Sequence, residues 1–152
     1  YSFFLKHCVT KFVYRLIDAR FPDYKVVIPG DNPFKLFVSK IDFQQALRRV
    51  SIFSNKSTNQ VALTITGNQL QLEAQDIDFS FEGNERLSCQ YNGDDLKIAF
   101  NAKFLIEMLN AAETQEVVIE LSTGTKAGIL KPTEQLEGED LMMLVMPLML
   151  NN

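Results

Sequence analysis

Residues 61–74 read VALTITGNQLQLEA, and this stretch decides the class of fold. Apolar and polar side chains alternate on both sides of Gly67-Asn68, which is typical of two antiparallel strands joined by a tight turn. Further on, residues 117–122 and 126–130 flank the turn at 123–125 in the same way, and the glycines of the two turns lie 57 positions apart. The sequence therefore predicts two β-hairpins in a weak internal repeat.

A strand and a helix precede each predicted hairpin. Residues 36–38 lead into a helix at about 40–53, and residues 96–100 lead into a helix that Asn101 caps and that ends near 112. A further strand follows each hairpin, at 79–90 and at 141–148. Two copies of this unit predict an α+β domain, an antiparallel sheet with two helices on one side.

Helical spacing separates core positions from surface positions. In the first helix the predicted core stripe consists of Phe43, Ala46, Leu47, Val50 and Phe53. Its opposite face is polar except for Ile52, which is either an isolated exposed side chain, as is common, or a contact with a partner. In the second helix the stripe consists of Leu105, Met108, Leu109 and Ala112, with Phe104 at its edge, where it can border a groove.

The composition offers little for catalysis or cofactor chemistry. The chain has one histidine, no nucleophile elbow and no phosphate-binding glycine loop, so we expect no enzyme and no catalytic residue. The carboxylates at 94–95 and 137–140 are more typical of solvated loops than of a metal site, and Cys8 and Cys89 fit no zinc motif. We therefore expect no metal and no cofactor.

The location and extent of the chain can also be predicted. No apolar run approaches the roughly 20 residues that a membrane-spanning helix needs, and no signal peptide is recognisable, so we expect a cytoplasmic protein with reduced thiols and no membrane contact. A net charge of −4 argues against tight phosphate binding over most of the surface, although a local basic face is compatible with it. The breaker-rich stretch 29–33 separates residues 1–33 from a complete domain at 34–152, and the start on strand-like residues leads us to expect a fragment of a longer protein.

Two segments resemble one known family closely. Residues 15–24, RLIDARFPDY, followed by VIP at 27–29, resemble the connector between the second and third domains of the bacterial sliding clamp, the beta subunit of DNA polymerase III. The ending VMPLML at 145–150 resembles the C-terminal tail of that family, and Ser54-Asn55 and Phe100-Asn101 lie at the family's spacing between the two. The resemblance covers essentially the whole chain. It implies that residues 1–33 are the end of the second clamp domain with its connector, and 34–152 the third domain.

The resemblance implies a DNA-clamp fold and a processivity factor for the replicative polymerase. Two chains of this family join head to tail in a homodimeric ring that encircles duplex DNA without reading its sequence. Ile52 and Phe53 then correspond to the dimer interface, where a partner would cover Ile52. Arg48, Arg49 and Lys103 correspond to the DNA channel, although they are also ordinary solvated helix positions.

The family's second role is recruitment. Replicative polymerase, clamp loader and repair proteins insert linear peptides, a Gln followed by aliphatic and aromatic residues, into a groove between the second and third domains. The resemblance places in this peptide-binding groove Pro22, Val27, Asn101, Phe104, Leu144, Val145, Met146, Pro147, Leu148, Met149 and Leu150. Thr58, Thr125 and Ala127 correspond by alignment only. Val26 and Met149 replace basic residues of other members, which implies a more apolar groove.

One alternative from another class fits the same residues. The chain can be a stand-alone peptide-binding or oligomerisation module on this fold that never encircles DNA. A small hydrolase is disfavoured because a base and a nucleophile are missing.

Overall fold

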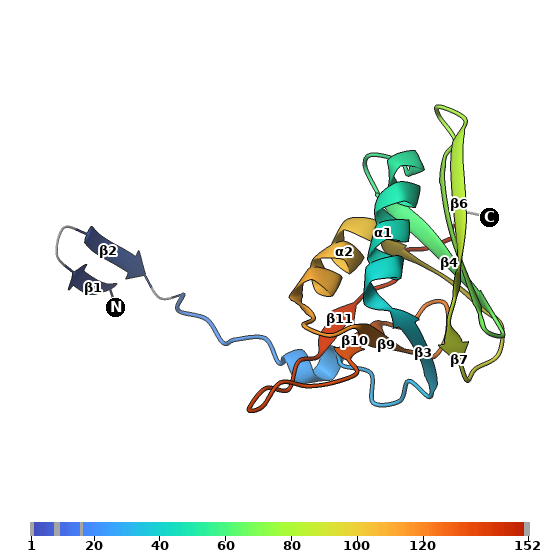
Figure 1. Ribbon diagram of the computed structural model, residues 1–152. Coiled ribbons are helices and arrows are strands. Elements are labelled where there is room, and N and C mark those ends of the chain that lie inside the picture. The colour runs from blue at the N-terminus through green and yellow to red at the C-terminus, as the bar shows by residue number, and fades with distance from the viewer. Residues whose placement is uncertain (1, 8–9, 16, 151–152) are drawn as a thin grey trace.

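The computed structural model describes residues 2–7, 10–15 and 17–150, with side chains described at Arg15 and from Ile17 onward. Strands β1 (Ser2–His7) and β2 (Thr10–Arg15) form an antiparallel hairpin, and a connector with the short helix η1 (Tyr24–Val27) leads on from it (Figure 1). Alternation of side chains at residues 9–17 predicts a strand, and the structure has β2 there from Thr10 to Arg15; Val9 and Leu16 lie outside the described residues.

The first half of the predicted repeat folds as a strand, a helix and a three-stranded meander. Its elements are β3 (Phe34–Ser39), α1 (Lys40–Val50), η2 (Ser51–Phe53), β4 (Gln60–Thr66), β5 (Gln69–Asp76) and β6 (Phe81–Ser88), followed by the short β7 (Gln90–Tyr91). Ser39 caps α1, since its hydroxyl accepts a hydrogen bond from the Asp42 backbone N–H. Gly67 adopts a positive φ of 55°, which the tight turn between β4 and β5 requires.

The second half repeats this order. Its elements are β8 (Leu96–Asn101), α2 (Ala102–Ala111), β9 (Glu116–Leu121), β10 (Gly128–Pro132) and β11 (Met143–Val145). The Asn101 side chain accepts a hydrogen bond from the Lys103 N–H at 2.9 Å, so the predicted N-cap of α2 is confirmed.

The two halves exchange their first strands. The five-stranded sheet has the order β11-β10-β9-β3-β7, and the four-stranded sheet has the order β6-β5-β4-β8. The strand β3 of the first half therefore pairs with β9 of the second, and β8 of the second pairs with β4 of the first. All of these strand pairs are antiparallel, which confirms the predicted α+β architecture. The strands form two sheets, whereas the sequence predicted one.

The core lies where the two helices pack on the inner faces of the sheets. Phe43 of α1 and Phe100 of β8 are fully buried, together with leucine, isoleucine and valine side chains of both sheets. The start of α1 lies against the end of α2, because the Lys40 ammonium donates to the Ala112 carbonyl at 2.6 Å and Gln44 donates to Asn110 at 2.8 Å. In the described part of the chain, no helix is long and apolar enough to cross a membrane.

Four expectations need correction. Phe53 leaves the core stripe, with 38% of its surface exposed, because α1 ends at Val50 and the tighter η2 turn shifts the angular phase of the residues that follow. The strand predicted at 79–90 divides into β6 and β7, which belong to different sheets. The strand predicted at 126–130 begins two residues later, at Gly128. The strand predicted at 141–148 is reduced to Met143–Val145 and one bridge at Leu148.

Candidate functional site

A groove of about 480 Å³ opens between α2 and the C-terminal tail. Asn101, Phe104 and Met108 follow one another at helical spacing, so they present one face of α2 to the groove. The facing wall is the tail segment Leu144–Leu148, and Glu107 completes the lining. Most of these side chains are apolar, so the groove can accept apolar side chains of a linear ligand.

The Asn101 side chain is held in a fixed position at one end of the groove. Its oxygen caps α2, and its amide nitrogen donates to the Thr58 carbonyl at 3.1 Å. The neighbouring Ala102 N–H donates to the Asn59 carbonyl at 2.8 Å, which fixes the backbone as well. Because a primary amide has two donors and an acceptor with two lone pairs, Asn101 keeps one donor and one acceptor for a ligand.

The tail wall is fixed at two points. Its first part, β11, pairs with β10, and the buried Val145 lies 3.6 Å from the position that a side chain on Gly128 would occupy. Pro147 has no N–H and interrupts the strand, after which the Leu148 N–H donates to the Ala99 carbonyl on the free edge of β8 at 2.7 Å. Between these points Met146 is 62% exposed, so it remains available at the rim.

The structure brings together only some of the residues that were expected in the groove. Asn101, Phe104 and the five residues from Leu144 to Leu148 line it. Pro22 and Val27 lie on the connector, are exposed and do not line it, and neither does Met149, which is 88% exposed. Leu150 lines a different cavity, because the tail passes the edge of β8 and Leu150 lies beside the four-stranded sheet (Figure 1).

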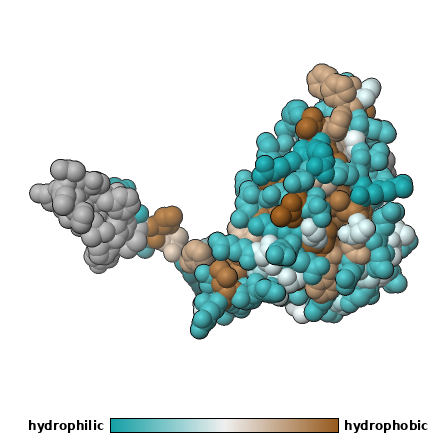
Figure 2. Space-filling view, viewed as in Figure 1, coloured by the Kyte–Doolittle hydropathy of each residue, from teal (hydrophilic) through white to brown (hydrophobic). Residues whose placement is uncertain are grey.

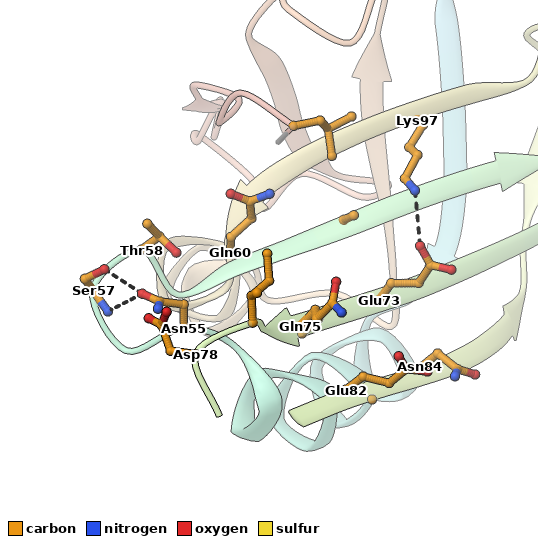
Figure 3. A pocket seen from close by; sticks show the side chains of 15 residues that line it. Asn55, Ser57, Thr58, Gln60, Glu73, Gln75, Asp78, Glu82, Asn84 and Lys97 are labelled. Carbon is orange, nitrogen blue, oxygen red and sulfur yellow. Dashed lines mark hydrogen bonds and ion pairs between the residues drawn. The ribbon is translucent and has the colours of Figure 1, made fainter. Parts of the chain in front are cut away.

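That second cavity is a polar hollow of about 560 Å³ at the four-stranded sheet (Figure 3). Lys97 forms an ion pair with Glu73 across its floor at 3.3 Å, and Asn55 accepts hydrogen bonds from the backbone and hydroxyl of Ser57 at its rim. Amide, hydroxyl and carboxylate groups dominate the lining, so the hollow differs in chemistry from the groove. Sequence reasoning missed this hollow, although the polar positions of β4 and β5 alternate on the face that forms it.

A surface of exposed apolar side chains lies at the end of the four-stranded sheet, and we call it the apolar end surface. Figure 2 shows apolar surface at this tip of the molecule. Its residues are Ile52, Phe53, Ile77, Phe79 and Phe81, which are between 38% and 74% exposed. The rings of Phe79 and Phe81 stack with centroids 6.1 Å apart. Sequence reasoning found Ile52 and Phe53 but read residues 79–81 only as part of a strand.

Gly83 determines how Phe53 sits on this surface. The glycine lies on β6, and a Cβ atom built there would lie 2.3 Å from Cδ2 of the Phe53 ring. The ring therefore packs directly on the backbone of β6, which is an edge strand of its sheet. No strand of the described residues pairs with the outer edge of β6, so the apolar end surface adjoins backbone groups with which a further strand could pair.

The three basic residues expected in the channel have different environments. Arg49 donates from Nε to a Glu85 carboxylate oxygen at 3.0 Å and pairs with the second oxygen through its terminal nitrogen. This hydrogen bonding lowers the pKa of Glu85 and raises the pKa of Arg49. Arg48 and Lys103 are exposed, and in the part of the chain with described side chains neither forms an ion pair. The described residues contain no group of three or more histidine, cysteine, aspartate or glutamate side chains that could hold a metal ion.

Comparison with known proteins identifies the family. The family model for the C-terminal domain of the DNA polymerase III beta subunit matches residues 25–148. A beta sliding clamp from Proteus mirabilis is 35% identical over 73% of this chain and 30% of its own length, and one from Haemophilus influenzae is 32% identical over 88% of this chain and 36% of its own length. The crystal structure of a DnaN sliding clamp from Bartonella birtlesii bound to griselimycin has a TM-score of 0.85 at 31% identity, over 92% of this chain and 37% of that one.

The chain therefore belongs to the bacterial sliding-clamp family, the beta subunits of DNA polymerase III, and corresponds to their C-terminal portion. Its α+β fold is the clamp fold of those structures. The chain spans about a third of the length of these relatives.

Proposed function

We propose that this chain is the C-terminal portion of a ring-shaped sliding clamp, a non-enzymatic processivity factor that keeps a replicative polymerase on duplex DNA. Residues 1–33 would be the end of the second clamp domain with its connector, and 34–152 the third domain. The match of residues 25–148 to the family model for the C-terminal domain supports the assignment of the third domain. The cytoplasm, where replication of a bacterial chromosome takes place, would be its location.

The ring would close as a homodimer through the apolar end surface. Support comes from five large apolar side chains exposed at one end of a sheet whose edge strand, β6, has a free side. An apolar surface that adjoins an edge strand suits both hydrophobic burial and strand pairing with a second copy. The exposed Arg48 and Lys103 would face the DNA, while Arg49 would serve mainly to fasten α1 to β6.

The groove between α2 and the tail would receive linear peptides of polymerase, clamp loader and repair proteins. The observation that carries this proposal is the combination of an apolar groove with one oriented amide, Asn101, that keeps hydrogen-bonding capacity. Apolar side chains of a peptide would enter the groove, and Asn101 would orient its backbone or its Gln side chain. Pro22 and Val27 would join this site when the second domain is present.

Titration calorimetry with a synthetic peptide, Gln-Leu-Ala-Leu-Phe, tests the groove. We expect weak binding by this chain, and loss of binding after deletion of Met146–Asn152. Phe104→Ala should weaken binding by about 1–2 kcal/mol, roughly five- to thirtyfold, because it removes a wall of the groove. Phe79→Ala is the matched control, since Phe79 is also an exposed phenylalanine but does not line the groove. Equal affinity of the deleted and complete chains would overturn the assignment.

A further inference from the structure

The groove contains one charged side chain among its described lining residues, Glu107 of α2. The Glu107 side chain is exposed, and within residues 17–150 no ion pair and no hydrogen bond engages its carboxylate. Lys103 lies one turn earlier on the same helix but does not line the groove. The carboxylate is therefore available to a ligand that lies in the groove.

A separate cavity with an acidic lining lies beyond the Met108 end of the groove, and we call it the acidic end. Ala111 extends the helical stripe of Phe104 and Met108, and Leu141 extends the tail wall in the same direction. Ala111 and Leu141 line this small cavity of about 90 Å³. The charged residues that line that cavity are all carboxylates: Glu113, Glu134 and Glu139. Neither cavity has a lysine or an arginine among its lining residues.

We propose that Glu107 is a specificity residue, which selects linear peptides that carry a lysine or arginine beside their apolar anchors. The apolar walls hold the anchors, and the carboxylate accepts charge-assisted hydrogen bonds from the adjacent cation. The acidic end favours further basic residues on the same side of the peptide by charge complementarity. This inference rests on the proposed peptide groove and adds the chemistry of the preferred partner.

The size of the preference follows from the exposure of Glu107. Ion pairs at an exposed rim are screened by water and salt, so each contributes modestly. We expect a peptide with two lysines to bind roughly three- to tenfold more tightly than its neutral counterpart at low salt. The preference should shrink as salt is raised, whereas the contribution of the apolar anchors should not.

A matched set of peptides and variants tests the inference. The peptides are Gln-Leu-Ala-Leu-Phe extended at either end by two lysines, two glutamines or two glutamates, measured by calorimetry against the complete chain. Glu107→Gln should lose most of the lysine preference at one end, so that the lysine and glutamine peptides extended at that end bind it about equally, and Glu107→Lys should favour the glutamate peptide. Glu82→Gln is the control, because it removes an exposed carboxylate from the polar hollow and changes the net charge equally.

The outcomes separate this inference from the groove itself. If the glutamine peptide binds and the lysine peptide binds no tighter, the specificity role of Glu107 is refuted while the groove stands. If Glu107→Gln and Glu82→Gln reduce the lysine preference equally, the effect is general electrostatics and the inference is likewise refuted. If no peptide binds in the groove at all, the proposed groove fails and this inference fails with it.

Discussion

Replacement of Gly83 by alanine should destabilise the chain through one contact. The new Cβ would lie 2.3 Å from Cδ2 and 2.9 Å from Cγ of Phe53, well inside the roughly 3.5–4.0 Å at which carbon atoms attract. Cγ is close to the backbone of Phe53, so a rotation of the ring tip does not relieve the clash. The ring must leave β6, or the strand must move.

The magnitude follows from the surface that Phe53 covers. A phenylalanine buries about 150–250 Å² when fully covered, and Phe53 is 38% exposed, so roughly 100–150 Å² is covered here. At about 25 cal/mol per Å², complete expulsion of the ring costs at most about 4 kcal/mol, and partial relaxation lowers this to about 1–3 kcal/mol. Urea denaturation followed by circular dichroism measures this loss in the free energy of unfolding.

Two comparisons isolate the contact. Gly30→Ala is the matched control, because a Cβ there meets no atom within 4 Å, and it should change the stability by less than about 0.5 kcal/mol. In a Phe53→Ala background the cost of Gly83→Ala should fall to nearly zero, since the clashing ring is absent. Equal costs of Gly83→Ala in the two backgrounds, or equal effects at Gly30 and Gly83, would refute the packing of Phe53 on β6.

Two further predictions concern the ion pair of α1 and the apolar end surface. The pKa of Glu85 is lowered from its ordinary 4.5, so the pair with Arg49 stabilises the folded chain fully above pH 4.5 and loses this effect as the pH falls through the lowered pKa. Glu85→Gln should therefore be slightly less stable than the parent protein at pH 7. Thermal unfolding at decreasing pH should show that this difference in stability vanishes in acidic solution. A difference that persists below the lowered pKa of Glu85 would contradict the stabilising role of the ion pair. In the full-length clamp of the proposed function, Ile52→Ala combined with Phe53→Ala should convert the proposed dimer to a monomer in sedimentation, and a persistent dimer would exclude this surface as the junction.

The fold was predictable wherever local patterns decide it. Gly67-Asn68 fixed the first hairpin by turn chemistry, and Asn101 fixed the start of α2 by its capping side chain. The exchange of β3 and β8 between the halves depends on pairing between distant strands, which alternation within one strand does not encode. The error at Phe53 arose because the 3.6-residue period was continued past the end of α1.

The two walls of the candidate site and their apolar character were predictable, but the path of the tail and the contacts between distant residues were not. The tail and Phe104 followed from the resemblance, yet Pro147 interrupts the expected strand, and this interruption leads the chain past β8 and takes Leu150 to the polar hollow. The pairing of Arg49 with Glu85 joins residues 36 positions apart and required the structure. Glu107 was not among the residues expected in the groove, because its position at the rim depends on where the tail lies.

Two-dimensional NMR of the chain during titration with Gln-Leu-Ala-Leu-Phe shows whether the groove binds linear peptides. We expect saturable shifts of the Asn101 side-chain amide, of α2 from Phe104 to Met108 and of the tail from Leu144 to Leu148. Residues of the polar hollow, such as Asn84, should remain unchanged. Shifts that gather in the hollow, or no saturable shifts in the groove at millimolar peptide, would contradict peptide binding in the groove.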